Sequence, residues 1–230
     1  SFVRQVLHGC GYWREAFPSL PDQRVLFLPD TFGFGATIPT LMRHCGLDTF
    51  VTNKLHWNGA NTFPHTDFVW RGLDGSEVAA HNTPSGDYNN ANTARAQRKA
   101  LRHHRTPRPD AEPAVFLHPF GYGDGGGGPT MEMAERVIAS GDCDGLARLR
   151  FGTMADFAEA LHARVGELPV VDDELYLELH RGTLTTQAWL KRANRRAEEA
   201  LERAEAHQIA GPREHEADKA ERARAQLDKA

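Results

Sequence analysis

The chain has few cysteines, no long apolar run and no strong excess of charge, and each of these absences narrows its class. Its three cysteines, Cys10, Cys45 and Cys143, lie far apart in the sequence. They lack the close pairs that a disulfide framework or a structural zinc site needs, so we expect a reducing compartment, with the cytoplasm as the default. No apolar stretch approaches the roughly 20 residues that span a bilayer, and no charged start followed by an apolar segment indicates a secretory signal.

The overall composition is typical of a folded globular chain. Of its 230 residues 40% are hydrophobic, and the formal net charge is −4 at pH 7. This content can bury a core in one or two domains, which excludes a membrane protein and a disordered one. The mildly acidic balance argues against a nucleic-acid partner, and the composition leaves a homo-oligomer open.

The first residues of the chain already follow a helical pattern. The chain starts at Ser1 without an initiator methionine, and Phe2, Val3, Val6 and Leu7 have helical spacing. We therefore expect that the chain is a fragment and that it begins inside its first helix. A site assembled from several loops would then lack the members that precede Ser1.

Strand-like and helix-like segments alternate along most of the chain, which predicts an α/β fold with a parallel sheet. Strands are expected near residues 24–28, 49–52, 114–118 and 149–152. Helices are expected over residues 36–45, 92–104, 131–139 and 154–165.

One segment interrupts this alternation. Two short apolar runs, 68–70 and 77–80, flank the turn-forming residues Gly72-Leu73-Asp74-Gly75-Ser76. This composition is typical of a β-hairpin. We expect the hairpin to be an inserted excursion near the mouth of the sheet.

The pattern becomes helical towards the C-terminus. Residues 188–206 carry an apolar stripe at three- to four-residue spacing and charges of alternating sign, which predicts a bundle helix ended by Gly211-Pro212. A second, charged and alanine-rich helix is expected over 217–230. We place the domain boundary so that residues 1–168 form the first domain and residues 169–230 a helical second one.

The first candidate for chemistry is Asp30, which ends the apolar run 24–28 and precedes a glycine-punctuated turn. A strand stopped by proline and glycine presents its last polar side chain at the mouth of a sheet, where α/β enzymes gather their reactive groups. A carboxylate there can bind a metal, attack an anomeric carbon or act as a general base. The alternative is an Asx turn that only stabilises the loop.

A second carboxylate, Asp124, lies in the glycine-rich run 121–128, ahead of a Pro-Thr helix start. Such a loop can cradle a phosphate through its backbone N–H groups. However, it lacks the Lys-Ser/Thr of a P-loop and the three-glycine dinucleotide fingerprint. Its four successive glycines would instead let the backbone approach a bulky polar ligand such as a sugar, next to the Asp124 carboxylate.

A third candidate, His180, ends the run 174–180, in which polar residues alternate with leucines and share one face of an extended segment. An isolated histidine is more often a core or surface residue than a ligand. This polar face favours the interpretation of His180 as a ligand. Two aspartates and a histidine at the ends of elements suggest a metal-assisted hydrolase.

The other histidines are weaker candidates. Those expected near the sheet mouth are His56, His65, His81 and His118. Those expected on helices, among charges and therefore solvated, are His44, His103, His104, His162, His207 and His215.

Five motifs in order resemble those of family 38 glycoside hydrolases, the zinc-dependent α-mannosidases, and most closely their bacterial and cytosolic branch. The resemblance extends from Ser1 to about Ala206. The matching stretches are Leu28–Gly33, Lys54–Asn58 with Asn61–His65, Gly72–Ser76, Gly121–Thr130 and Glu174–Gln187.

The resemblance implies a retaining α-mannosidase that removes terminal α-linked mannose from a mannose-containing oligosaccharide with the help of Zn²⁺. The implied fold is a seven-stranded β/α barrel followed by a three-helix-bundle middle domain. Residues 1–168 would form part of the barrel, and residues 169–230 would begin the bundle.

Individual residues match the family's motifs. Asp30 matches the nucleophile, which also ligates zinc, and His180 matches a zinc-ligating histidine. Asp124 falls at the position of the acid/base carboxylate. The resemblance also implies that three residues line the sugar pocket: Lys54, Trp57 and Tyr88.

The chain also departs from the family pattern. A His-x-Asp segment that supplies two further zinc ligands has no counterpart after Ser1, so we expect an incomplete zinc site and a chain that is weakly active or inactive alone. Four residues also differ from those usual in the family. Gly35 stands in place of a serine, Asn53 of a glutamine, Asp173 of a glycine and Leu184 of a tyrosine. The competing hypotheses are a non-catalytic carbohydrate-binding or scaffold fragment and a metal-dependent deacetylase-like hydrolase.

Overall fold

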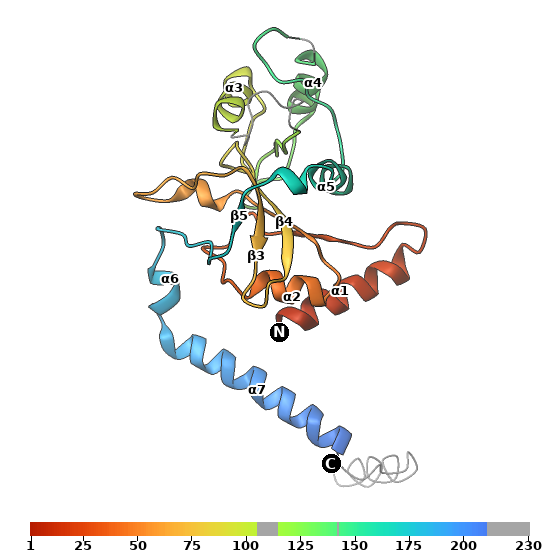
Figure 1. The fold of residues 1–230 in the computed structure, drawn as a ribbon, viewed down its shortest axis with the longest axis vertical. Helices are drawn as coiled ribbons and strands as arrows, with labels where there is room; N and C mark the ends of the chain where they lie inside the picture. Colours follow the sequence, from red (N-terminus) through yellow and green to blue (C-terminus); the bar gives the residue numbers. More distant parts are fainter. Residues whose placement is uncertain (105–114, 142, 211–230) are drawn as a thin grey trace, which may run out of the picture. The chain divides into compact units, whose positions relative to one another are not determined.

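The computed structural model describes residues 1–104, 115–141 and 143–210 (Figure 1). The chain divides into two compact units, residues 1–181 and 182–230. The expected breaker at residues 211–212 and the expected helix over 217–230 lie outside the described residues.

Five strands form one mixed sheet in the first unit (Figure 1). In spatial order they are β1 (Val25–Phe27), β2 (Thr49–Thr52), β4 (Glu77–Asn82), β3 (Asp67–Arg71) and β5 (Val170–Val171). The first three run parallel to one another, β3 is antiparallel to β4, and β5 is parallel to β3. The α/β class is therefore confirmed, but the sheet is not purely parallel.

The predicted hairpin exists, although its expected place was wrong. β3 and β4 pair antiparallel as predicted, with Val69 opposite Ala79. However, β4 lies between β2 and β3 in the middle of the sheet, so the hairpin is part of the main sheet and not an excursion. Most residues of its two strands are buried, whereas its turn at residues 73–75 is exposed.

Two expected strands were wrong. Residues 115–118 and 149–152 form no strand in the structure. A short apolar run becomes a strand only if a partner pairs with it, and pairing depends on distant parts of the chain.

The helices agree better with the sequence pattern. Their bounds are α1 (Phe2–Ala16), α2 (Ile38–His44), α3 (Ala94–His103), α4 (Met131–Ala139), α5 (Met154–His162), α6 (Gly182–Thr185) and α7 (Ala188–Ala210), with 3-10 turns η1 (Lys54–Trp57) and η2 (Val165–Glu167). Threonine side chains cap α3, α4 and α5, and Thr153 forms a capping box with Asp156. These caps explain why the helix starts could be predicted closely.

Helices cover the sheet on both faces. Along β3, Phe68 and Trp70 point into a core that includes Met42 of α2. The intervening Val69 packs with Phe157 of α5 on the opposite face. This two-residue alternation buries both faces, as expected for a sheet between helical layers.

The first unit extends beyond the boundary expected between residues 168 and 169. Val170 pairs with Val69, and Leu175 forms two backbone hydrogen bonds with Phe34. Leu175 and Leu177 are buried, as the alternation predicted, but residues 174–180 form only this isolated bridge and no strand. These contacts join the segment up to Arg181 to the sheet.

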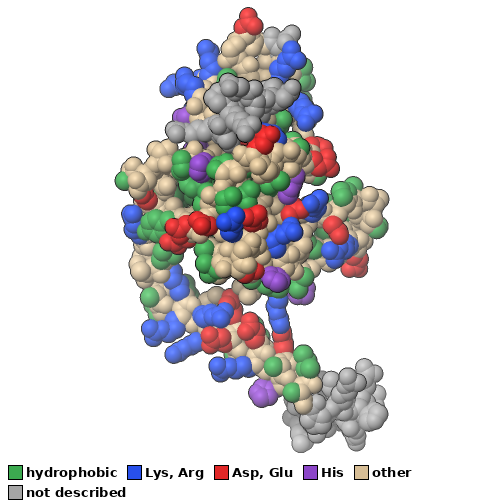
Figure 2. Space-filling model, viewed as in Figure 1, with side chains coloured by type: hydrophobic (Ala, Val, Ile, Leu, Met, Phe, Trp, Pro, Cys, Tyr) green, Lys and Arg blue, Asp and Glu red, His purple; other side chains and the backbone are tan. Residues whose placement is uncertain are grey.

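The described part of the second unit consists of α6 and α7. Acidic and basic side chains are interspersed along α7 (Figure 2), and Arg195 pairs with Glu198 and Glu199. Leu190 and Leu201 of the predicted apolar stripe are exposed. None of the helices in the described ranges is both long and apolar enough to cross a membrane.

Candidate active site

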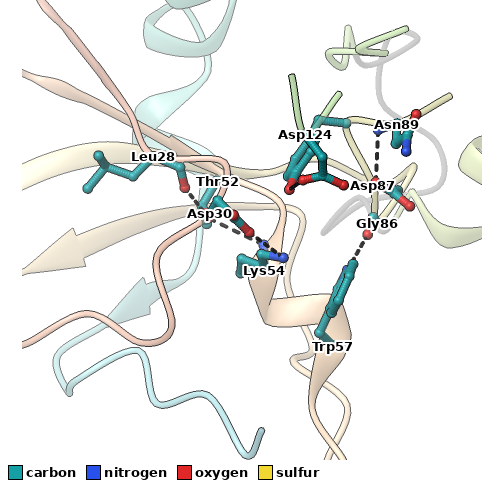
Figure 3. A network of polar contacts seen from close by, with 10 residues as sticks. Leu28, Asp30, Thr52, Lys54, Trp57, Gly86, Asp87, Asn89 and Asp124 are labelled. Atoms are coloured by element: carbon teal, nitrogen blue, oxygen red, sulfur yellow. Dashed lines mark hydrogen bonds and ion pairs between the residues drawn. The ribbon is translucent and has the colours of Figure 1, made fainter. Parts of the chain in front are cut away.

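The candidate site lies at one edge of the sheet because three parallel strands end there. β1, β2 and β4 run in the same direction, so the segments that follow them emerge at the same edge. Asp30 follows β1, Lys54 and Trp57 lie on η1 after β2, and residues 86–89 follow β4. Figure 3 shows residues from these three segments, together with Asp124.

An ion pair between a buried lysine and a half-exposed aspartate joins the first two segments. The Nζ atom of Lys54 lies 2.6 Å from Oδ1 of Asp30, and the side chains are 3% and 51% exposed, respectively. Figure 3 shows the ammonium directed at the carboxylate. Because Lys54 is almost fully buried, its charge depends on this partner and on nearby aromatic faces.

Aromatic rings surround the rest of the ammonium. The Nζ atom of Lys54 lies 3.6 Å from the centroid of the Trp57 ring, 5.4 Å from that of Phe32 and 5.5 Å from that of Tyr88. Cation–π attraction of this kind strengthens when water is excluded. The ammonium thus lies where the residues after β1, β2 and β4 meet.

The turn after β4 is fixed by backbone hydrogen bonds. The indole N–H of Trp57 donates to the carbonyl oxygen of Gly86 at 2.7 Å, as Figure 3 shows. Gly86 has a φ of +69°, a left-handed conformation that favours glycine. The N–H of Asn89 donates to Oδ1 of Asp87 at 2.8 Å, so the turn presents Tyr88 in a defined position.

Tyr88 holds the second candidate carboxylate. Its hydroxyl donates to Oδ1 of Asp124 at 2.7 Å. The glycine loop packs closely against it, since a Cβ atom on Gly123 would lie 2.6 Å from Cε2 of Tyr88. Glycine at 123 therefore brings Asp124 to the tyrosine, whereas the sequence suggested that the loop's glycines make room for a ligand.

The same hydroxyl also interacts with Asp30. The pKa of Tyr88 is raised above its usual value, first by the hydrogen bond to Asp124, then by burial, and then by the charge of Asp30. The phenol therefore stays protonated at neutral pH. Tyr88 interacts with both carboxylates that the sequence singled out, although they are far apart along the chain.

His180 is held near the segment that follows Asp30. Its ring centroid lies 4.8 Å from that of Phe32, and the Phe34–Leu175 bridge joins the two segments. Both His180 and Asp124 have positive φ angles, +56° and +51°. Strained backbone at non-glycine residues is often retained at functional sites.

The described residues do not by themselves fit a zinc ion. A protein zinc site uses three or four side-chain ligands. In the described ranges no three His, Cys, Asp or Glu side chains come close enough together to hold a metal. Only Asp30 and His180 remain of the expected ligand set, and one carboxylate oxygen of Asp30 pairs with Lys54.

The expectation that the helix histidines are solvated was wrong for His104, and His81 and His162 also have polar partners. His81 is fully buried, with Nδ1 2.6 Å from Oδ1 of Asp67. The side chain of His104, expected to be solvated, is 8% exposed, and its Nε2 atom lies 3.8 Å from the other oxygen of the same carboxylate. His162 lies 3.0 Å from the Thr49 hydroxyl. Histidines beside a charge pattern look solvated in sequence, and only packing shows which of them pair with buried carboxylates.

Sequence reasoning missed a set of hydrogen bonds beside the site, between Glu178 and residues 58–61. The carboxylate of Glu178 accepts hydrogen bonds from the backbone N–H groups of Ala60 and Asn61, at 2.8 and 2.7 Å. The N–H of Glu178 donates to Oδ1 of Asn58 at 2.9 Å. These bonds fasten the loop after Trp57 to the segment that carries His180. The alternating polar face of residues 174–180 was the only signal for it.

Sequence reasoning also missed a cavity next to Trp57. The cavity has a volume of about 530 Å³ and is lined by His56, Trp57, Thr62, Gly86, Asp87, Lys99 and His103. Among the described residues that line it, Trp57 was a candidate from the sequence and His56 a weaker one. The carboxylates of Asp30 and Asp124 do not line it.

The comparisons with known proteins agree on one family. The sequence model of the family described as "Glycosyl hydrolases family 38 N-terminal domain" matches residues 1–175. "Alpha-mannosidase G" of Dictyostelium discoideum is 40% identical over 201 residues, which are 86% of this chain and 18% of that protein. "Alpha-mannosidase 2C1" of Homo sapiens is 39% identical over 201 residues, 87% of this chain and 19% of that protein.

A solved structure supports the fold. The crystal structure of an alpha-mannosidase from Enterococcus faecalis V583 matches with a TM-score of 0.53 at 15% identity, covering 75% of this chain and 20% of that one. The chain thus spans about a fifth of the length of the proteins it matches.

Proposed function

The chain belongs to glycosyl hydrolase family 38, and from this premise we propose that it forms part of the catalytic domain of a retaining α-mannosidase. The substrate would be a mannose-containing oligosaccharide with a terminal α-linked mannose. The observation that carries the proposal is the series of contacts from Asp30 to the Lys54 ammonium, from that ammonium to the Tyr88 ring, and from the Tyr88 hydroxyl to Asp124. Two carboxylates close to one another are what a retaining glycosidase requires.

In the proposed reaction Asp30 is the nucleophile. One of its carboxylate oxygens attacks the anomeric carbon of the mannose and forms an ester. The bond from that carbon to the leaving oxygen breaks as Asp124 gives its proton to that oxygen. Water then attacks the same carbon, Asp124 takes the proton from the water, and Asp30 is released as a carboxylate.

Lys54 and Tyr88 would support these two carboxylates. The ammonium at 2.6 Å fixes the orientation of Asp30. Because the pKa of Tyr88 is raised, its hydroxyl remains available to donate to Asp124 after that group has given up its proton. Both partners sit on segments that follow parallel strands, so they are held rigidly.

The cofactor and the architecture are also proposals. We propose Zn²⁺ as cofactor, with Asp30 and His180 as the ligands from this chain and the remaining ligands from residues outside it. When bound, the ion would orient sugar hydroxyls. The parallel strands β1, β2 and β4 support a partial β/α barrel in the unit that ends at Arg181, and the α7 pattern supports the start of a three-helix bundle in the unit that begins at Gly182.

The test uses the longest natural polypeptide that contains this chain, here called the parent protein, because the curated relatives are much longer than the chain. The parent protein should hydrolyse an aryl α-mannoside, and a 5-fluoro-mannosyl fluoride should leave a covalent sugar on Asp30, detected by peptide mass spectrometry. Asp30→Asn should abolish labelling, whereas the exposed control Asp172→Asn should not.

Two outcomes would contradict the proposal. Labelling of a residue other than Asp30 would remove it as nucleophile. Binding of mannosides without any turnover would favour the alternative of a carbohydrate-binding or scaffold fragment. The three free cysteines support a cytoplasmic location, which fluorescence microscopy of the tagged parent protein would test.

A further inference from the structure

The segment that follows Tyr88, residues 89–92, takes no part in the chemistry proposed above. Two of its asparagines are nevertheless buried, with exposures of 9% for Asn90 and 0% for Asn92. Burying an amide side chain costs free energy unless the amide is hydrogen-bonded. The hydrogen bonds of these two residues reach both ends of the loop that carries Asp124.

Asn90 fixes the start of this loop through its backbone and its side chain. Its N–H donates to the carbonyl oxygen of Gly121 at 3.0 Å, and the N–H of Gly121 donates back to the carbonyl oxygen of Asn90 at 2.7 Å. The side-chain Nδ2 atom donates to Nε2 of His118 at 3.3 Å. Burial lowers the pKa of His118, so the imidazole is neutral at pH 7 and can accept this bond. The base of the loop is thus held at residues 118 and 121.

The side chain of Asn90 is itself held in one orientation. Its Oδ1 atom accepts a hydrogen bond from the backbone N–H of Asn92 at 2.8 Å, which forms an Asx turn. Asn92 has a φ of +51°, and asparagine adopts this left-handed conformation more readily than most residues. Because Oδ1 is occupied in the turn, Nδ2 is the atom directed at His118.

Asn92 fixes the other end of the loop. Its Nδ2 atom donates to the carbonyl oxygen of Met133 at 3.1 Å. Met133 lies in the first turn of α4, which begins directly after the loop at the capping residue Thr130. The guanidinium of Arg136, further along α4, donates to the carbonyl oxygen of Ala91 at 2.7 Å. Residues 91 and 92 therefore anchor the helix into which the loop runs.

Between these two ends the loop closes on itself. The N–H of Tyr122 donates to the carbonyl oxygen of Gly128 at 2.8 Å, and the N–H of Gly128 donates to the carbonyl oxygen of Tyr122 at 2.9 Å. Asp124 lies inside this closed loop, where its carboxylate accepts the hydrogen bond from Tyr88. A closed loop moves as a unit with its base, so the place of the Asp124 carboxylate depends on how the two ends are anchored.

We propose that Asn90 is a positioning residue for Asp124, because it holds the base of the loop where the carboxylate can meet the oxygen between the two sugars. The proposal rests on the proposed function, in which Asp124 transfers a proton to that oxygen. Asn90 is buried and acts only through the loop. Its loss should therefore slow the steps in which Asp124 transfers a proton and spare those that need no proton.

The first experiment varies the leaving group in the parent protein. Phenyl α-mannoside needs protonation of its departing oxygen, whereas 2,4-dinitrophenyl α-mannoside releases a stable phenolate without it. Asn90→Ala should lower kcat/KM for the phenyl substrate about 100-fold, as expected for a catalytic group misplaced by about 1 Å. It should lower kcat/KM for the dinitrophenyl substrate about twofold or less. Asp124→Asn should show the same selectivity with a larger loss.

Two further variants separate positioning from a general loss of structure. Leu161→Ala opens a cavity in the core on α5, next to His162, which contacts Thr49 at the start of β2. Because the site lies where β2 ends, this variant should affect the two substrates equally. His118→Phe keeps an aromatic ring and removes the acceptor for Nδ2 of Asn90. It should reproduce the selectivity of Asn90→Ala, and it replaces that variant if Asn90→Ala does not fold.

The second half of the reaction gives an independent readout. Release of mannose from Asp30 needs Asp124 to take a proton from water, whereas azide attacks without a base. One azide nitrogen bonds to the anomeric carbon, the ester bond to Asp30 breaks, and the product is α-mannosyl azide. With the dinitrophenyl substrate, azide should raise kcat of Asn90→Ala about tenfold and leave kcat of wild type and of Leu161→Ala unchanged. Mass spectrometry identifies the azide product.

Equal losses on the two aryl mannosides, no loss on either, or no response to azide would overturn the inference. A wild-type parent protein that hydrolyses neither mannoside would instead overturn the proposed function. Amide hydrogen exchange would then still decide whether Asn90 fixes the loop. Asn90→Ala should speed exchange in residues 121–128 and leave it unchanged in α5, and unchanged exchange in the loop would show that Asn90 does not hold it.

Discussion

The ammonium of Lys54 lies 2.6 Å from the carboxylate of Asp30 and 3.6 Å from the ring centroid of Trp57. A nearly fully buried cation is stable there only because the carboxylate and the aromatic faces compensate for the loss of water. In the proposed mechanism this pair orients the nucleophile, so changes to either partner should lower catalysis.

Replacing Lys54 with methionine keeps most of the side-chain volume and removes the charge. We expect kcat to fall about 100-fold, because a preorganised charge next to the nucleophile is lost. Lys54→Arg should recover part of the loss. Steady-state kinetics on the parent protein with an aryl α-mannoside measures this, and thermal unfolding serves as the control for folding. A variant with wild-type kcat would show that the ion pair only stabilises the fold.

The raised pKa of Tyr88 has a spectroscopic signature. An unperturbed tyrosine ionises near pH 10, and Tyr88, whose pKa is raised, should ionise only above that pH. The difference in tyrosinate absorbance between wild type and Tyr88→Phe should therefore be close to zero at pH 10 and appear at higher pH. A difference already complete at pH 10 would mean that the hydroxyl does not donate to Asp124.

The same shift predicts how stability depends on alkaline pH. The folded pKa of Tyr88 lies above the unfolded value near 10. Its contribution is fully present below pH 10 and is lost as the pH rises through the folded pKa. The free energy of unfolding, measured with denaturant, should fall less steeply above pH 10 in Tyr88→Phe than in wild type.

Glycine 123 is required by the approach of its backbone to Tyr88. A Cβ atom there would overlap the ring, so Gly123→Ala should displace the loop that carries Asp124. We expect a loss of about 1–3 kcal/mol in unfolding free energy, as for other overpacked sites, with a larger relative loss of kcat. Gly166→Ala is the matched control, because nothing lies within 4 Å of its added Cβ atom.

Acid should destabilise the fold through His56. Its folded pKa is lowered to about 4, whereas the unfolded value is near 6.5. The unfolded state therefore binds the extra proton first, and stability falls as the pH drops from about 6.5 to 4, by about 3 kcal/mol if this group acts alone. Denaturant unfolding at several pH values measures the slope, which should be smaller in His56→Gln. An unchanged slope would contradict a buried, neutral imidazole.

Metal content tests the proposed ligands directly. Elemental analysis of the purified parent protein should find zinc, and Asp30→Ala and His180→Ala should each reduce it, with Asp172→Asn as the unaffected control. Removal of the metal with a chelator should abolish hydrolysis. Activity that resists the chelator would reject zinc as the cofactor.

Local patterns predicted most of the elements. The bounds of α4 agree with the expected 131–139, and those of β2 with 49–52, because helix caps and apolar periodicity are determined within a few residues of each element. The position of Asp30 after a strand is equally local. The family resemblance, carried by short ordered motifs, is confirmed by the match over residues 1–175.

Long-range relationships could not be predicted in this way. Nothing in residues 67–82 shows that the hairpin occupies the middle of the sheet, since strand order depends on pairing with β2 and β5. His104 and His162 lie among charges in the sequence, but packing places them against Asp67 and Thr49. The roles of the site residues remain predictions that the experiments above test.

The sequence alone determined the helices, two of the parallel strands, the family and the residues most suited to chemistry, because each of these is encoded in neighbouring or motif-spaced positions. Only the tertiary structure decided that Lys54 pairs with Asp30, that Tyr88 interacts with two distant carboxylates, and that a cavity opens beside Trp57. Such contacts depend on how the strands pair and the loops pack, which is set by the sum of many weak interactions across the whole chain.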